Sequence, residues 1–216
     1  MQIEPASSFP DLRLAQITCR QGRSLPRWTA SGAIYHVAFH LADSIPQTEL
    51  AFWRELRSEI TLRAKEEDRP LTAEEIDLLR SCYDEKVERY LAAGCGECIL
   101  KSAGVYEVLE QVILYDNGRD YAIHEYCFMP NHLHVIVGGF PAAEMVAHTI
   151  RAWKSVSAHK INKMLSRTGD VWMKDAYTRI IRNEEEYRRQ LSYVWMNPES
   201  ANMTMGFLRN RFVEWM

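Results

Sequence analysis

Long apolar runs are absent from this chain of 216 residues. No stretch approaches the roughly 18 consecutive apolar residues that a membrane-spanning helix needs. The stretch from Met1 to Leu14 carries an early acidic residue and prolines, and it lacks an apolar run of signal-peptide length. We therefore expect a cytoplasmic protein that has no membrane partner.

Cysteine is also scarce, and its five positions are too few and too irregular to suggest a disulfide framework. Cys95 and Cys98 form a single CxxC pair, whereas a structural zinc site usually takes four ligands. We expect these thiols to be reduced and free of metal. A glycine-rich phosphate-binding loop is missing as well, and we expect no small-molecule cofactor.

The chain also lacks a strong net charge, because it carries only −3 at neutral pH. The charge is nevertheless divided unevenly. Residues 44–98 hold eight Lys and Arg against thirteen Asp and Glu, and residues 151–189 hold ten against five. A nucleic-acid site, if there is one, therefore belongs in the basic C-terminal part.

Hydrophobic periodicity divides the chain into strands and helices. Strands are expected over 33–42, 119–130, 132–140 and 175–183. Helices are expected over 48–67, 72–94, 103–116, 142–165 and 184–198. Thr72 and Glu75 have the spacing of a capping box, which marks the start of the second helix. No internal repeat is present.

The second and third strands must be antiparallel, because the link between them is too short for a crossover. The element order predicts an α+β fold with a ferredoxin-like antiparallel sheet and helices packed on it. We expect an N-terminal arm over 1–30, one domain over 31–200 with a helical insertion at about 45–100, and a C-terminal tail over 201–216.

Two histidines interrupt an otherwise apolar strand in the run "MPNHLHVIV". Residues two apart in a strand face the same side, so His132 and His134 point together while Leu133 points to the opposite layer. Two imidazoles about 6.5–7 Å apart along a strand can converge on one metal ion. The alternative is a pair of histidines hydrogen-bonded on the sheet surface.

The last predicted helix offers a possible partner for them. Its apolar stripe runs through Tyr187, Leu191 and Val194, and Tyr193 lies off that stripe. Tyr193 and Asn197 are four residues apart and therefore neighbours on the polar face. Tyr193 is either an ordinary surface residue or a nucleophile one turn before a metal ligand, whereas Tyr187 should face the core.

Three segments in this order carry a resemblance to a known family. They are "MPNHLHVIV", "RAWKSVSAHKINKMLSRTGDVW" and "RIIRNEEEYRRQLSYVWMNP". Together with "LPRWTASGAIYHVAFHLADSIP" they resemble the REP-associated tyrosine transposases, which are HUH (His-hydrophobe-His) single-strand DNA transposases. The resemblance covers most of residues 25–198 and implies the HUH transposase fold.

The resemblance also implies roles for individual residues. His132 and His134 match the metal-binding pair, Asn197 matches a third ligand, and Tyr193 matches the single nucleophilic tyrosine. Lys154 and Arg182 match basic positions of the pattern. The implied metal is Mg²⁺ or Mn²⁺, and the implied reaction is DNA nicking and strand transfer through a covalent 5′-phosphotyrosine.

The chain departs from the pattern after Trp172, where Ala176 replaces an aromatic residue and Thr178 replaces an ionisable one. The expected partner is single-stranded or hairpin DNA, bound by a monomer or a homodimer. Two alternatives stay open, a hairpin-binding relative without catalysis and an unrelated metal-binding α+β protein. Candidate phosphate contacts are Lys154, Lys160, Lys163, Arg179 and Arg182.

Overall fold

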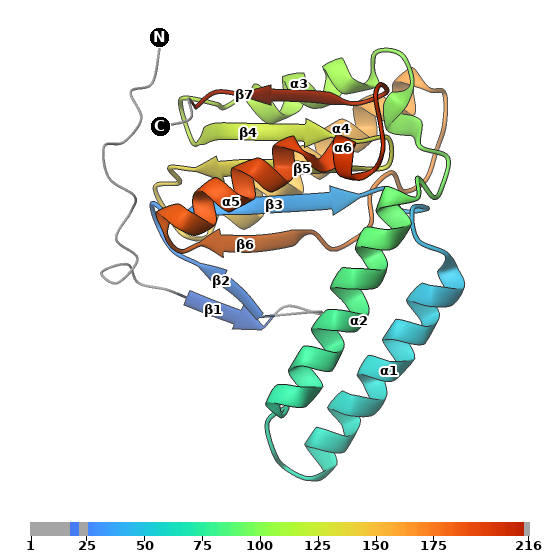
Figure 1. Ribbon diagram of the computed structural model, residues 1–216, viewed down its shortest axis with the longest axis vertical. Coiled ribbons are helices and arrows are strands. Elements are labelled where there is room, and N and C mark those ends of the chain that lie inside the picture. The colour runs from blue at the N-terminus through green and yellow to red at the C-terminus, as the bar shows by residue number, and fades with distance from the viewer. Residues whose placement is uncertain (1–17, 22–25, 214–216) are drawn as a thin grey trace.

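A five-stranded antiparallel sheet forms the centre of the protein (Figure 1). The computed structural model describes residues 18–21 and 26–213. The strands run in the order β6-β3-β5-β4-β7. Their bounds are Ile34–His40 for β3, Ala122–Phe128 for β4, His132–Gly138 for β5, Tyr177–Ile181 for β6 and Leu208–Arg211 for β7.

Four helices lie between or after the strands of this sheet. They are α3 (Val105–Leu114), α4 (Met145–Met164), α5 (Glu184–Trp195) and the short α6 (Asn197–Ser200). The series β3, α3, β4, β5, α4, β6 places the first strand between the third and the last, which is the ferredoxin-like arrangement. The predicted α+β fold is therefore confirmed.

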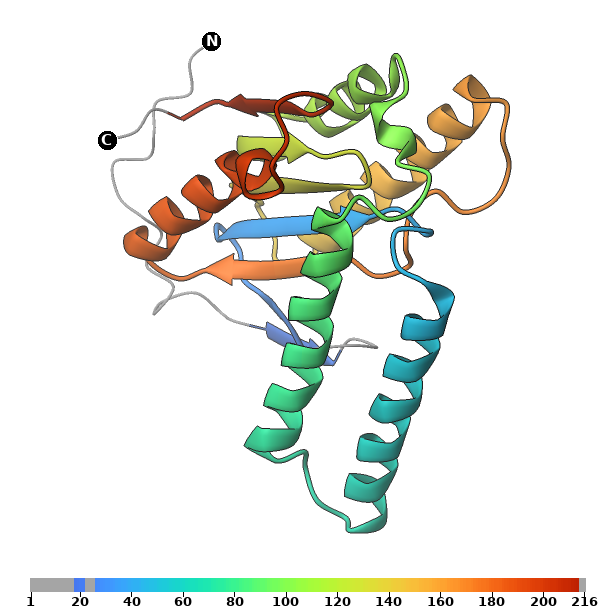
Figure 2. The same cartoon turned by 45° about the vertical axis from the view of Figure 1, so that its right-hand side comes forward.

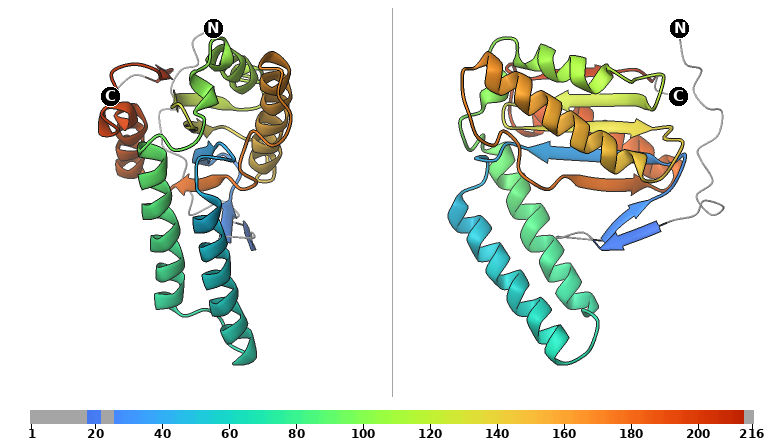
Figure 3. Two further views of the ribbon diagram at one scale, coloured as in Figure 1. Left: turned by 90° about the vertical axis from the view of Figure 1, so that its right-hand side faces the viewer. Right: turned by 180° about the vertical axis from the view of Figure 1, so that it is seen from behind.

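Strand β5 shows why the sheet has two different faces. Leu133, Val135 and Val137 point into the main core, where they pack with residues of α3 and α4. Helix α5 covers the opposite face, where Leu191 and Val194 are buried in a second, smaller cluster. Figure 3 shows α4 and α5 on opposite sides of the sheet. The alternation expected from the sequence thus separates the core from a face that carries both histidines of β5.

The predicted insertion is a helical hairpin made of α1 (Gln47–Glu66) and α2 (Ala73–Ala92). It extends away from the sheet (Figure 2). The predicted capping box at Thr72 and Glu75 is present, with both of its hydrogen bonds. Val87 of α2 is buried with Leu50 and Trp53 of α1, so apolar contacts hold the base of the hairpin together.

Two segments outside the predicted domain also form strands. Strand β7 pairs with β4 although it lies in the predicted C-terminal tail. Strands β1 (Thr18–Gln21) and β2 (Pro26–Thr29) pair with each other within the predicted N-terminal arm. The rest of that arm (residues 1–17 and 22–25) and the last three residues of the chain lie outside the described residues. None of the described helices is long and apolar enough to cross a membrane.

Candidate active site

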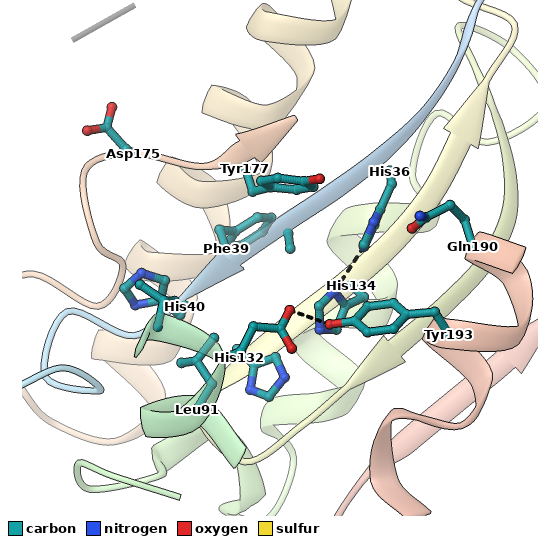
Figure 4. A pocket seen from close by; sticks show the side chains of 13 residues that line it. His36, Phe39, His40, Leu91, His132, His134, Asp175, Tyr177, Gln190 and Tyr193 are labelled. Carbon is teal, nitrogen blue, oxygen red and sulfur yellow. Dashed lines mark hydrogen bonds between the residues drawn. The ribbon is translucent and has the colours of Figure 1, made fainter. Parts of the chain in front are cut away.

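Strand β5 presents two buried histidines to the face that α5 covers. His132 and His134 are each 4% exposed, and their ring centroids are 5.0 Å apart. Both side chains line a cavity of about 240 Å³, together with residues of β3, α2 and α5. Figure 4 shows the two imidazoles beside the ring of Tyr193.

Helix α5 brings the candidate tyrosine to the same cavity. Asn183 caps the helix, since its side chain accepts a hydrogen bond from the backbone N–H of Glu186. The burial of Leu191 and Val194 sets the rotation of the helix. The ring of Tyr193 consequently faces the sheet, with its centroid 5.5 Å from that of His134. Tyr187, as expected, packs against the smaller cluster.

Asn197 follows one helical turn later and reaches the first histidine. Its Oδ1 lies 3.3 Å from Nε2 of His132. A side-chain hydrogen bond also joins Asn197 to the hydroxyl of Tyr193 and acts to lower the pKa of that hydroxyl. The four residues selected from the sequence come from β5, α5 and α6, and they meet at one place.

Hydrogen bonds around His132 determine which of its ring nitrogens is free of a proton. The side-chain nitrogen of Asn131 donates to the carbonyl oxygens of Leu91 and Cys95, so its Oδ1 accepts from Nδ1 of His132 at 2.8 Å. Burial lowers the pKa of His132 to about 4, so the ring is neutral at pH 7. Nε2 of His132 and Oδ1 of Asn197 are then two acceptors facing each other.

A cation between these two acceptors would satisfy both, and so the donor set fits a metal ion. The second ligand fits as well. Nδ1 of His134 is engaged by another histidine, which leaves Nε2 as its only remaining donor atom. Among the described residues, no cluster of three or more His, Cys, Asp or Glu side chains could hold a metal ion. A cation here would therefore depend on two imidazoles and an amide oxygen.

His36 is a site residue for which the sequence supported no role. Its Nε2 lies 2.9 Å from Nδ1 of His134, and it is buried on β3. Gln190 of α5 bonds to the His36 side chain. A chain of contacts thus runs from Gln190 on α5 through His36 on β3 to His134 on β5. It orients the His134 ring. The antiparallel pairing of β3 with β5 creates this contact, and that pairing leaves no local signal in the sequence.

Glu88 of α2 is the second unforeseen residue. The hydroxyl of Tyr193 donates a hydrogen bond to Oε1 of Glu88 at 2.5 Å. Burial raises the pKa of Tyr193 well above its usual value, and the Glu88 carboxylate raises it further. The phenol is therefore protonated at neutral pH, and its proton is directed at the helical hairpin.

The candidate DNA-binding residues are spread over both sides of the sheet. Lys160 and Lys163 are exposed on α4, which packs on the face opposite the histidines. The ammonium of Lys154 donates to the backbone carbonyls of Met173 and Lys174. Arg179 of β6 pairs with Glu186 at 2.6 Å. Arg182 is exposed just before α5. DNA contact by these five residues stays a prediction. Of the five, Arg179 lies on β6 and Arg182 lies just before α5.

Acid is expected to destabilise the metal-free protein between about pH 6.5 and pH 4. Burial lowers the pKa values of His36 and His132 from 6.5 to about 4. Between these values the unfolded chain binds protons that the folded protein does not, so the free energy of unfolding falls as the pH falls. Urea unfolding at pH 7.5 and at pH 5 would measure this loss. We expect a smaller loss in His132→Gln, and an equal loss in that variant would contradict the assignment.

Comparison with known proteins finds one family model that matches part of the chain. The family model described as "Transposase IS200 like" matches residues 99–180. This part of the chain is similar to the IS200-like transposases. The match confirms the transposase resemblance predicted from the sequence. The matched segment contains His132 and His134 and ends before α5, so Tyr193 and Asn197 lie outside it.

A solved structure described as "Structure of the REP associates tyrosine transposase bound to a REP hairpin" is 15% identical, with a TM-score of 0.45. The similarity covers 84% of this chain and 73% of that one. No curated protein matches the chain.

Proposed function

We propose that the protein is a metal-dependent enzyme that nicks single-stranded or hairpin DNA and transfers the cut strand. The observation that carries the proposal is that Tyr193 lines one cavity with His132 and His134, and that Asn197 contacts His132 beside it. The family match of residues 99–180 supports the same class of reaction. All four groups come from one chain, so a monomer would hold a complete site.

Tyr193 supplies the nucleophile in this proposal. Its phenolic oxygen attacks a phosphorus atom of the DNA backbone, and the bond from phosphorus to the 3′ oxygen breaks. The products are a 5′-phosphotyrosine link and a free 3′-hydroxyl. Because the covalent link retains the phosphodiester bond, a second 3′-hydroxyl can displace Tyr193 without nucleotide hydrolysis.

His132, His134 and Asn197 would hold Mg²⁺ or Mn²⁺ in the proposed site. When bound, the ion supplies charge neutralisation at the scissile phosphate. Two nitrogen ligands favour Mn²⁺ over Mg²⁺. His36 and Asn131 keep the two imidazoles in the required orientation, since each of them bonds to the Nδ1 of one ring.

A labelled substrate tests the proposed function. The wild-type protein is mixed with Mn²⁺ and hairpin-tailed single-stranded DNA labelled at its 3′ end. We expect a labelled adduct that survives denaturing electrophoresis, because the 5′ phosphate of the downstream fragment stays on the protein. A 5′ label should instead appear in a released fragment.

The same experiment separates the alternatives. DNA binding without an adduct would support a hairpin-binding relative that lacks catalysis. Metal binding without DNA binding would support an unrelated α+β metal protein.

A further inference from the structure

The helical hairpin brings a carboxylate to the candidate nucleophile, and the proposed function does not yet use it. Glu88 lies 105 residues before Tyr193 and accepts the hydrogen bond of its hydroxyl at 2.5 Å. Glu88 also lines the cavity that contains His132 and His134. The end of α2 is therefore part of the site.

The position of Glu88 is held by contacts on both sides of it. Val87 is buried in the apolar cluster at the base of the hairpin, and Leu91 packs against that cluster. The carbonyl oxygen of Leu91 accepts a hydrogen bond from Asn131, the residue that orients His132. The side chain of Asn131 thus connects the last turn of α2 to the first residue of β5, which positions Glu88 on the same side of the sheet as the imidazoles.

Attack by Tyr193 requires that its phenol lose a proton. A phenol with an ordinary pKa near 10 is almost fully protonated at neutral pH. A general base must lie within hydrogen-bond reach of the proton that it removes. Glu88 meets this geometric condition. Asn197, which also bonds to the hydroxyl, cannot accept the proton because its amide is not basic.

We propose that Glu88 is the general base that takes the phenolic proton of Tyr193 during DNA cleavage. This role rests on the proposed function. The proton passes to the Glu88 carboxylate as the bond from the Tyr193 oxygen to phosphorus forms. The bond from phosphorus to the 3′ oxygen breaks, and that oxygen takes a proton from water. Glu88 is exposed, so it returns its own proton to solvent.

Strand transfer runs the same proton path in reverse. An incoming 3′-hydroxyl attacks the phosphotyrosine and loses its proton to water. The bond from phosphorus to the Tyr193 oxygen breaks, and Glu88, which has taken a proton back from solvent, gives that proton to the departing phenolate. One carboxylate therefore serves as base in cleavage and as acid in transfer.

Glu88→Gln tests this role because it keeps the size of the side chain and removes its basicity. The rate of adduct formation is measured in single turnovers at saturating DNA and Mn²⁺, from pH 5 to pH 9. We expect a loss of about 10²- to 10⁴-fold, the usual contribution of a general base. DNA affinity should change by less than about threefold, since a lost base acts on the rate and not on binding. The matched control is Glu66→Gln, which makes the same charge change at an exposed position at the far end of α1.

Two further readouts separate a base from a merely structural residue. The pH profile of the rate should differ between the wild type and Glu88→Gln, because the variant lacks the group that takes the phenolic proton. Added formate should restore part of the rate in Glu88→Ala by replacing the missing carboxylate.

The result that would overturn the role of Glu88 differs from the result that would overturn the proposed function. An unchanged rate in Glu88→Gln, with an unchanged pH profile, overturns the role of Glu88. A faster rate also overturns it, because Glu88 would then act by repelling the phosphate. If the wild type forms no adduct, the proposed function itself fails.

Discussion

Tyr193→Phe is expected to abolish the covalent protein–DNA adduct while the protein still folds and binds DNA. The variant loses one oxygen atom and keeps the ring that packs beside His36 and His134. Loss of a nucleophile typically lowers the rate by more than a thousandfold. The measurement is the adduct assay with 3′-labelled hairpin DNA and Mn²⁺, with DNA affinity determined in parallel.

Tyr187→Phe is the matched control on the same helix. The Tyr187 hydroxyl bonds to Nδ1 of His124 at 2.6 Å, and the ring packs in the cluster between α5 and the sheet. We expect this variant to form the adduct at a rate close to that of the wild type. An adduct in Tyr193→Phe that is absent from Tyr187→Phe would show that the nucleophile is misassigned.

His132→Ala and His134→Ala are expected to weaken Mn²⁺ binding by at least about 100-fold, since loss of an outer-shell partner alone costs 10- to 100-fold. Each substitution removes one of two imidazoles from a site whose third donor is the weak amide oxygen of Asn197. Calorimetric titration with Mn²⁺ measures the affinity directly. The adduct assay should fail in both variants at Mn²⁺ concentrations that saturate the wild type.

His159→Ala is the control for these substitutions, because His159 is exposed on α4 and lies behind the sheet. It should bind Mn²⁺ as tightly as the wild type does. If all three histidine variants bound Mn²⁺ with the affinity of the wild type, the metal would lie elsewhere in the protein. If neither the wild type nor the variants bound Mn²⁺, the protein would hold no such ion. Chelation with EDTA should stop adduct formation by the wild type, and adduct formation that continues after chelation would contradict metal dependence.

A local pattern was sufficient for the strand that carries the candidate metal ligands. The alternation in β5 places His132 and His134 on one face and directs Leu133 to the core, because successive residues of a strand face opposite sides. This relation depends only on backbone geometry over a few residues, so it can be read from the chain directly. The helical repeat of α5 was less informative, because Tyr193, which was placed off the apolar stripe, packs against the same cluster as Leu191.

The contacts of His36 and Glu88 could not be read in the same way. His36 contacts His134 because β3 pairs with β5 in one particular register, and Glu88 contacts Tyr193 because the C-terminal end of α2 lies beside α5. The same limit applies to Lys160, whose helix packs on the face opposite the histidines.

The sequence by itself determined the fold class, the resemblance to the transposases and the face of β5 on which both histidines lie. Tertiary structure alone decided which faces of separate elements meet, and therefore which side chains surround the tyrosine. The physical reason is that periodicity acts within an element, whereas contact between elements depends on how apolar surfaces distant in the chain are buried together.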